Sequence, residues 1–273
     1  MPDAGRNSSI DARQDALLAI VRQRGYVSIE AMASRFAVSA QTIRRDIKSL
    51  SKRRLLERHH GGAGLPPGTD ALAYTSRKVR HAPEKQLIGR LVARQIPNGA
   101  SLFIDIGTTT EAVAEALVNH RDLRVVTNHI AVASMLSEHT DFEIVLTGGV
   151  VRKRDQAVIG EASADFLQRF KVTYGIFGIG TIDSDGELLD YDYRDVQVSR
   201  TAIANSRKRF IVMDKSKFDG DAMIKVGHLS QVDALFTDGA PPTDVQRILR
   251  ANKVRLHVPG RRRANDSKVR SAR

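Results

Sequence analysis

Residues 39–50 read SAQTIRRDIKSL, a stretch whose side chains fall on two opposite faces of a helix. At 3.6 residues per turn, one face is apolar and carries Ile43, Ile47 and Leu50. The other face is polar, with charges of one sign only, and consists of Gln41, Arg44, Arg45 and Lys48. Ser39 stands where the N-cap of such a helix belongs. Because cations and amides bind phosphates and base edges, this helix predicts contact with nucleic acid.

A shorter helix is expected directly before this one, over residues 28–36. Its inward face carries the apolar side chains Ile29, Met32, Ala33 and Phe36. Only Ala37 and Val38 separate the two helices. Two helices joined this closely, the second of them basic, predict a helix-turn-helix that binds DNA. A further helix is expected to come first, over residues 12–24.

The sequence KRRLLERHHGGAG at residues 52–64 is expected to form a wing beside the helix pair. Arg58 and His59 lie in its centre, where they would face the DNA backbone. Glycine and proline then dominate residues 61–68, GGAGLPPG, a composition typical of a hinge.

The net charge of +12 is concentrated at the two ends of the chain. Residues 1–60 hold 12 lysines and arginines against 6 aspartates and glutamates, and residues 261–273 hold 6 against 1. The stretch between them is nearly balanced, with 25 against 24. Basic ends around a balanced middle are typical of a nucleic-acid-binding head joined to a domain with another task. The basic tail itself is expected to be disordered.

From residue 83 on, short apolar runs alternate with helical stretches. The runs are SLFIDI, LRVVTN, FEIVLTGG, VTYGIFGIG, KRFIVMD, DALFTD and VRLHV. This alternation predicts a doubly wound, mostly parallel α/β sheet. We therefore expect a winged helix-turn-helix domain over residues 10–65, a linker over 66–82, an α/β effector domain over 83–259 and a tail over 260–273.

Small and polar residues follow several of these runs, at the sheet edge where ligands of such folds bind. SLFIDI ends in Asp105, and Gly107 then opens a helix that begins with Thr108, Thr109 and Thr110. Free amides at a helix N-terminus attract phosphate, and a carboxylate can accept hydrogen bonds from polyol hydroxyls. Other loops at this edge contribute Asn128, Gly149, Gly180 and Lys215. Together these residues predict a site for a small phosphorylated polyol or sugar.

Several other patterns predict ordinary structure. Residues 183–187, DSDGE, lack the later ligands of a calcium loop and are expected to form a turn. Residues 152–154, RKR, are expected to be a solvated loop. His59 and His60 have no cysteine nearby and no helical partner, which argues against a metal site.

The composition excludes several classes of protein. The chain has no cysteine and no G-x-S-x-G or H-E-x-x-H motif, and its first residues, MPDAGRNSSIDARQ, lack the apolar core expected of a signal peptide. It also has no apolar run of the about 20 residues that a membrane span needs. We therefore expect a cytoplasmic protein with no catalytic residue, no metal, no cofactor and no membrane contact.

The motifs together resemble the DeoR family of bacterial sugar-metabolism regulators. The likeness extends from about Tyr26 to Pro242 and includes SAQTIRRDIKSL, LLERHHGGA, IPNGASLFIDIGTTTEAVAEAL, VVTN, GGVVRKRDQAVIGEA, FGIGTIDSDGELLDYDY and VMDKSKF. The HHGGA and DIGTTTEAVA segments are most similar to the part of the family that governs glycerol 3-phosphate use.

The resemblance implies a winged helix-turn-helix followed by an effector domain similar to ribose-5-phosphate isomerase. Such regulators bind operator DNA as homo-oligomers, dimers or tetramers, and release it when a phosphorylated sugar or polyol binds. The residues implied at the DNA are Gln41, Thr42, Arg44 and Arg45. Those implied at the phosphate are Asp105, Gly107, Thr108 and Thr109, with Asn128 and Lys215 nearby.

Two alternatives stay open at this point. The effector can be fructose 1-phosphate, a tagatose derivative or a deoxyribose phosphate, because a phosphate loop binds the group that all of them share. The chain can also be a phosphosugar isomerase with an accessory DNA-binding head. Its base would be an aspartate such as Asp105, Asp190, Asp192 or Asp195, although a shared fold does not confer activity.

Overall fold

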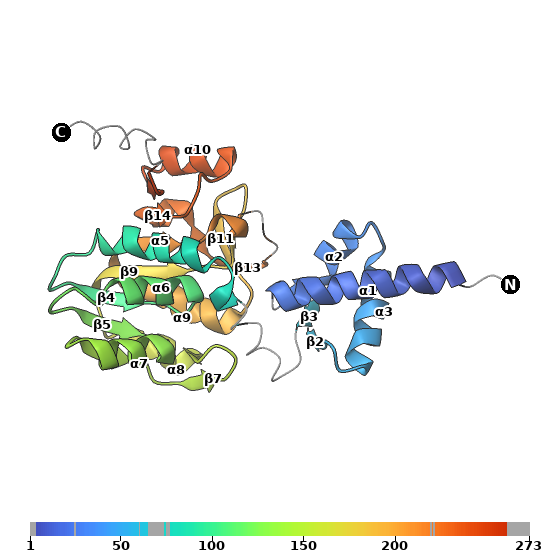
Figure 1. Ribbon diagram of the computed structural model, residues 1–273, viewed down its shortest axis with the longest axis horizontal. Coiled ribbons are helices and arrows are strands. Elements are labelled where there is room, and N and C mark those ends of the chain that lie inside the picture. The colour runs from blue at the N-terminus through green and yellow to red at the C-terminus, as the bar shows by residue number, and fades with distance from the viewer. Residues whose placement is uncertain are drawn as a thin grey trace, which may run out of the picture.

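The computed structural model describes residues 4–24, 26–59, 61–64, 74, 77–218, 220 and 222–260 (Figure 1). We call residues 4–64 the head and residues 77–260 the body. The predicted hinge at 61–68 is described only as far as residue 64, the predicted linker only at residue 74 and from 77 on, and the predicted tail only at residue 260. The side chain of His59 and all of His60 also lie outside the described residues.

The head is a winged helix-turn-helix, as predicted. Its helices are α1 (Ala4–Arg24), α2 (Ile29–Arg35) and α3 (Ala40–Lys52), and α1 begins earlier than expected. The strands β1 (Tyr26–Ser28), β2 (Glu57–His59) and β3 (Gly62–Gly64) form an antiparallel sheet in the order β1-β3-β2, in which the β2–β3 hairpin is the wing.

Capping and burial explain the local structure of the head. The hydroxyl of Ser28 accepts a hydrogen bond from the Ala31 amide at 3.2 Å, and the hydroxyl of Ser39 accepts one from the Thr42 amide at 3.2 Å. The apolar faces of the helices meet in one core, which includes Leu17, Val21, Met32, Ile43, Ile47, Leu50 and Leu56.

A buried carboxylate joins α1 to α3. Asp46 is 3% exposed and accepts hydrogen bonds from Arg13 Nε at 2.6 Å and Gln14 Nε2 at 3.1 Å. The sequence pattern had not predicted a polar contact on this side of α3. Its effect is to fix how α3 sits against α1, because a buried carboxylate is stable only when it is paired and hydrogen-bonded.

The body is built on a seven-stranded parallel sheet, which confirms the predicted α/β fold. Its strand order is β15-β14-β12-β9-β4-β5-β6. The strands are β4 (Ser101–Ile104), β5 (Arg124–Thr127), β6 (Glu143–Leu146), β9 (Val172–Gly178), β12 (Ser206–Val212), β14 (Ala234–Phe236) and β15 (Arg255–His257). Smaller antiparallel units are the β7 (Val150–Arg152)–β8 (Ala157–Ile159) hairpin and the sheet of β10 (Thr181–Ile182), β11 (Glu187–Asp190) and β13 (Ile224–His228). Short 3₁₀ turns lie at Lys215–Lys217 and Leu229–Gln231.

Helices cover both faces of the sheet (Figure 1). One face packs against α5 (Ala82–Ala93), α6 (Thr108–Ala116) and α7 (Ile130–His139). The other packs against α8 (Glu161–Leu167), α9 (Tyr193–Ala204) and α10 (Thr243–Ala251). This two-sided burial explains the nearly continuous apolar strands of the sequence.

Two features of the described chain bear on the sequence predictions. Residues 183–186 form the expected turn, in which Asp183 Oδ1 accepts a hydrogen bond from the Asp185 amide at 3.0 Å. Among the helices described, none is both long and apolar enough to cross a membrane.

Candidate functional site

The cationic face of α3 is open to solvent. The side chains of Gln41, Arg44, Arg45 and Lys48 are exposed, and Arg58 is exposed on the wing strand β2. Ser39 and Thr42 have a local task as well, because their hydroxyl oxygens lie 2.9 Å apart at the N-terminus of α3. The head therefore presents cations and an amide on one helix and one wing, the elements that enter a groove and contact phosphates in winged helix-turn-helix proteins. Their contact with DNA stays a prediction.

The body has its own candidate site at the carboxyl ends of the sheet strands. Strand order reverses between β4 and β9, since β5 and β6 continue on one side of β4 and β12, β14 and β15 on the other side of β9. Ligands of open α/β sheets bind at such a reversal. The loops after β4 and β9 come close together there, because a Cβ added to Gly178 would lie 3.2 Å from the Ile106 oxygen.

The loop after β4 delivers the N-terminus of α6 to this point. Gly107 precedes α6 with φ 138°, a conformation that residues other than glycine rarely adopt. Gly107 has no side chain that could accept a hydrogen bond from the first amides of α6. The Thr110 hydroxyl donates a hydrogen bond to the Gly107 oxygen at 2.7 Å. The first amides of α6 are therefore not capped by Gly107, and they can bind an anion.

Three buried side chains around this point have unused hydrogen-bonding atoms. Within the described part of the chain, Thr109 Oγ1, both amide atoms of Asn128 and Asp195 Oδ1 have no hydrogen-bond partner. Thr109 is 2% exposed and Asn128 is fully buried. Buried polar atoms normally find a partner, so unpartnered ones at a sheet edge indicate a place where a polar ligand binds.

Asp105 lies at the centre of this group. Its carboxylate accepts hydrogen bonds from Ser199 Oγ at 2.6 Å and from the Ile106 amide at 2.8 Å. Burial raises the pKa of Asp105 to about 7, although the hydrogen bonds from Ser199 and from the Ile106 amide oppose that shift. A carboxyl group with a pKa near neutrality can both accept and donate hydrogen bonds to polyol hydroxyls.

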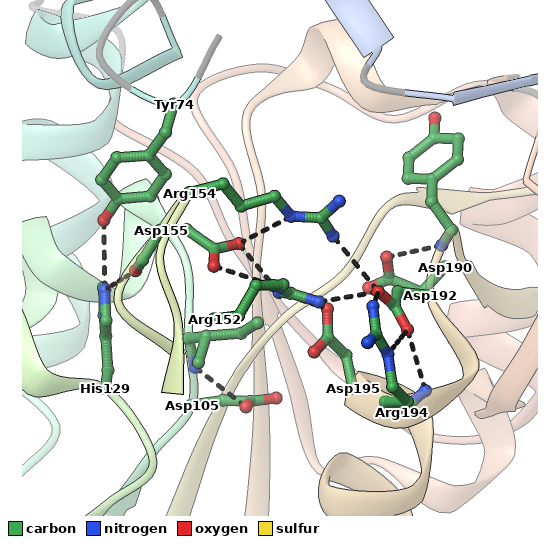
Figure 2. A network of polar contacts seen from close by, with 12 residues as sticks. Tyr74, Asp105, His129, Arg152, Arg154, Asp155, Asp190, Asp192, Arg194 and Asp195 are labelled. Carbon is green, nitrogen blue, oxygen red and sulfur yellow. Dashed lines mark hydrogen bonds and ion pairs between the residues drawn. The ribbon is translucent and has the colours of Figure 1, made fainter. Parts of the chain in front are cut away.

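A buried arginine organises the rim of the site (Figure 2). Arg152 has a side chain 9% exposed, and its guanidinium donates to Asp155, Asp192 and Asp195, each at 2.8 Å. The prediction of a solvated loop over residues 152–154 was wrong for this residue. The reason is that two of its three carboxylate partners, Asp192 and Asp195, lie at the start of α9, which only the fold brings next to the β7–β8 hairpin.

The electrostatics of these carboxylates differ. Against the effect of burial, Arg194 and Arg152 lower the pKa of Asp192 to about 2. Burial raises the pKa of Asp195 to about 7, although Arg152 opposes this shift. Asp192 is therefore ionised and forms ion pairs with the arginines. Asp195, in contrast, keeps one oxygen without a partner within the described part of the chain.

The remaining predicted residues lie around the same edge in different environments. Gly149 has φ 142°, and a Cβ there would lie 3.0 Å from the Ile159 oxygen. A Cβ at Gly180 would meet the ring of Tyr191 at 2.8 Å, so this glycine permits close packing of β11. Lys215 has a side chain 68% exposed that lies 4.0 Å from Asp238. The effector contacts of these three residues stay predictions.

Sequence reasoning missed Lys217, two residues beyond Lys215. Its ammonium donates to the Ile179 oxygen at 2.9 Å, and burial lowers its pKa. The KSK pattern gave only a weak signal, because the two lysines of a 3₁₀ turn point to different sides of it and the apolar runs do not say which lysine points inward.

A winged helix-turn-helix head on an α/β body with a polar site at the strand reversal defines a two-domain regulator with a DNA-binding and a ligand-sensing part. Comparison with known protein families agrees with both parts. Residues 13–67 match the DeoR-like helix-turn-helix domain, and residues 80–239 match the DeoR C-terminal sensor domain. The chain belongs to the DeoR family.

Several relatives are named as transcriptional repressors. The chain is 48% identical to the glycerol-3-phosphate regulon repressor of Escherichia coli (strain K12), over 90% of this chain and 98% of the relative. It is 46% identical to the glycerol-3-phosphate regulon repressor of Haemophilus influenzae, over 89% of this chain and 95% of the relative. Ribose 5-phosphate isomerase A from Neisseria gonorrhoeae is similar in structure over 49% of this chain and 52% of the isomerase, with 14% identity and a TM-score of 0.36.

Proposed function

We propose that this protein is a transcriptional repressor of genes for glycerol 3-phosphate use. The head would bind operator DNA through Gln41, Arg44, Arg45 and Lys48 of α3, with Arg58 of the wing on the backbone. Glycerol 3-phosphate would bind the body and weaken that contact. The proposal includes action in the cytoplasm and binding to a symmetric operator as a homo-oligomer.

The observation that carries the proposal is the set of unpartnered buried atoms beside the α6 N-terminus. The helix amides suit the phosphate, and Asn128, Thr109 and Asp195 offer both donors and acceptors to the two hydroxyls of a glycerol phosphate. The similarity to two glycerol-3-phosphate regulon repressors supports the choice of this effector among phosphorylated polyols.

The test is a mobility shift with the DNA upstream of the protein's own gene and a random duplex of equal length. Specific binding of this class has a Kd of about 10⁻⁸–10⁻¹¹ M at physiological salt. We expect a clear preference for the upstream DNA, reduced by glycerol 3-phosphate more than by fructose 1-phosphate, tagatose 6-phosphate or deoxyribose 5-phosphate. Equal binding to both duplexes would refute the DNA-binding part. An equal response to all four phosphates, or a larger response to another one, would refute the choice of effector.

A further inference from the structure

Two side chains join the segment before α5 to α6 and to the N-terminus of α7. The Tyr74 hydroxyl lies 3.1 Å from His129 Nε2, and the two rings meet edge to face (Figure 2). Lys78 Nζ lies 2.9 Å from Glu111 Oε2. This segment leads back along the chain toward the wing, whose strand β3 ends at Gly64, ten residues before Tyr74.

The two attachment points form one buried cluster. Glu111 is 4% exposed and His129 is fully buried, and Glu111 Oε1 lies 3.4 Å from His129 Nε2. Burial raises the pKa of Glu111 to about 7 and lowers the pKa of His129 to about 4. His129 is thus neutral at pH 7, and the ammonium of Lys78 is the cation that faces the Glu111 carboxylate.

Both anchors directly follow residues of the candidate effector site. Glu111 comes after the three threonines of the α6 N-terminus, and its amide donates to the Gly107 oxygen at 2.9 Å. His129 follows Asn128, and its amide donates to Thr127 Oγ1 at 3.1 Å. A ligand that binds the α6 amides and Asn128 therefore contacts the same two backbone segments that carry Glu111 and His129.

We propose that Tyr74 and Lys78 form a latch through which occupancy of the effector site controls the head. The inference rests on the proposed function and adds to it the route of coupling. Effector binding changes the positions of Glu111 and His129, and with them the strength of the latch. The free energy that couples effector binding to operator binding then equals the difference in the free energy of the latch contacts between the effector-free and the effector-bound protein. Each ligand changes the affinity of the other by the same factor.

The contacts predict a specific uncoupling. Tyr74→Phe removes only the hydroxyl that meets His129, and Lys78→Met removes only the charge that meets Glu111. Neither side chain belongs to the α3 surface or to the proposed effector contacts. A net hydrogen bond or ion pair of this kind corresponds to about a three- to tenfold change in an equilibrium constant. We expect each variant to lower the ratio of operator Kd with and without effector by about that factor.

The experiment measures this ratio on the full chain by fluorescence anisotropy, with glycerol 3-phosphate as effector and a duplex selected from random sequence by the wild-type protein. Calorimetry of each variant with glycerol 3-phosphate is run in parallel. Tyr193→Phe and Lys171→Met are matched controls, since both side chains are exposed and the chemical changes are the same. Glu111→Gln, alone and combined with Lys78→Met, completes a double-mutant cycle.

The latch is supported if Tyr74→Phe and Lys78→Met lower the ratio, the controls keep it, and the cycle shows non-additive effects. A wild-type ratio in both latch variants, with normal folding and effector binding, overturns the latch and leaves the proposed function standing. Loss of glycerol 3-phosphate binding in the calorimeter also overturns it, because these residues would then be ligand contacts. If the wild-type ratio itself is one, the proposed function fails and the latch fails with it.

Discussion

Replacing Arg152 with methionine is the sharpest test of how the effector site is held together. The guanidinium donates to Asp155, Asp192 and Asp195, each at 2.8 Å, from a side chain only 9% exposed. Methionine keeps most of the aliphatic volume and removes the charge. Three carboxylates then remain close together around an apolar side chain.

The expected loss of stability follows from this geometry. Removing one partner of a buried ion pair costs about 3–5 kcal/mol, because the other charge is left buried and uncompensated. Arg154 and Arg194 still reach Asp192 at 3.3 and 2.8 Å, which compensates part of the loss. We therefore expect the free energy of unfolding of the body to fall by about 3 kcal/mol, the lower end of that range.

The assay is urea unfolding followed by far-ultraviolet circular dichroism, because the chain has no tryptophan to report by fluorescence. Arg121→Met is the control, since its side chain is exposed and the chemical change is the same. A surface change of this kind is expected to alter stability by no more than about 0.5 kcal/mol. If Arg152→Met unfolds at the same urea concentration as Arg121→Met, the network does not hold the site together.

The pH dependence gives a second measure of the same network. The pKa of Asp155 and the pKa of Asp192 both lie below the ordinary value of an aspartate, and that of Asp192 is about 2. Folding therefore favours the ionised forms of both side chains. Their contribution to stability is present above the unfolded pKa of about 3.9 and is lost as the pH falls toward 2. We expect the gap between wild type and Arg152→Met to be larger at pH 7 than at about pH 2.5. A gap that widens as the pH falls would contradict this assignment.

Three further predictions separate the roles of the head and the body. Arg45→Ala should weaken operator binding, lower the slope of log K against log salt by about 1 and leave effector affinity unchanged. If titrations show that both operator and effector affinity are lost together, α3 has only a structural role. Thr108→Ala or Lys215→Ala should leave operator binding intact and abolish release by glycerol 3-phosphate in a mobility shift, and normal release in both variants would mean that the site lies elsewhere. Asp46→Ala should destabilise the head by about 2 kcal/mol in thermal unfolding, because Arg13 and Gln14 lose a buried charged acceptor. An unchanged unfolding midpoint would show that the contact does not contribute to stability.

The parts of the fold that were predictable from sequence depend on local periodicity. The stripe of Ile43, Ile47 and Leu50 gave α3 and its buried face, and the apolar runs gave the parallel sheet. The loop at Gly107 was predictable because a glycine followed by three threonines at a strand end is a local signature of a helix N-terminus.

The parts that were not predictable depend on contacts between distant segments. Arg152 looks like any charged loop residue until the N-terminus of α9 brings Asp192 and Asp195 to it from about 40 residues away. Asp46 looks like a solvent-facing helix residue until α1 supplies Arg13.

The central claim is that one ligand bound in the body controls DNA bound by the head. The most direct measurement is a titration of glycerol 3-phosphate into the complex of the full-length protein with its selected operator duplex, followed by fluorescence anisotropy at fixed salt. The account predicts that operator Kd rises by about 5- to 150-fold at saturation, and that inorganic phosphate at the same concentration and ionic strength has a much smaller effect. An operator Kd that is unchanged at saturating glycerol 3-phosphate, with effector binding verified by calorimetry, would contradict the claim.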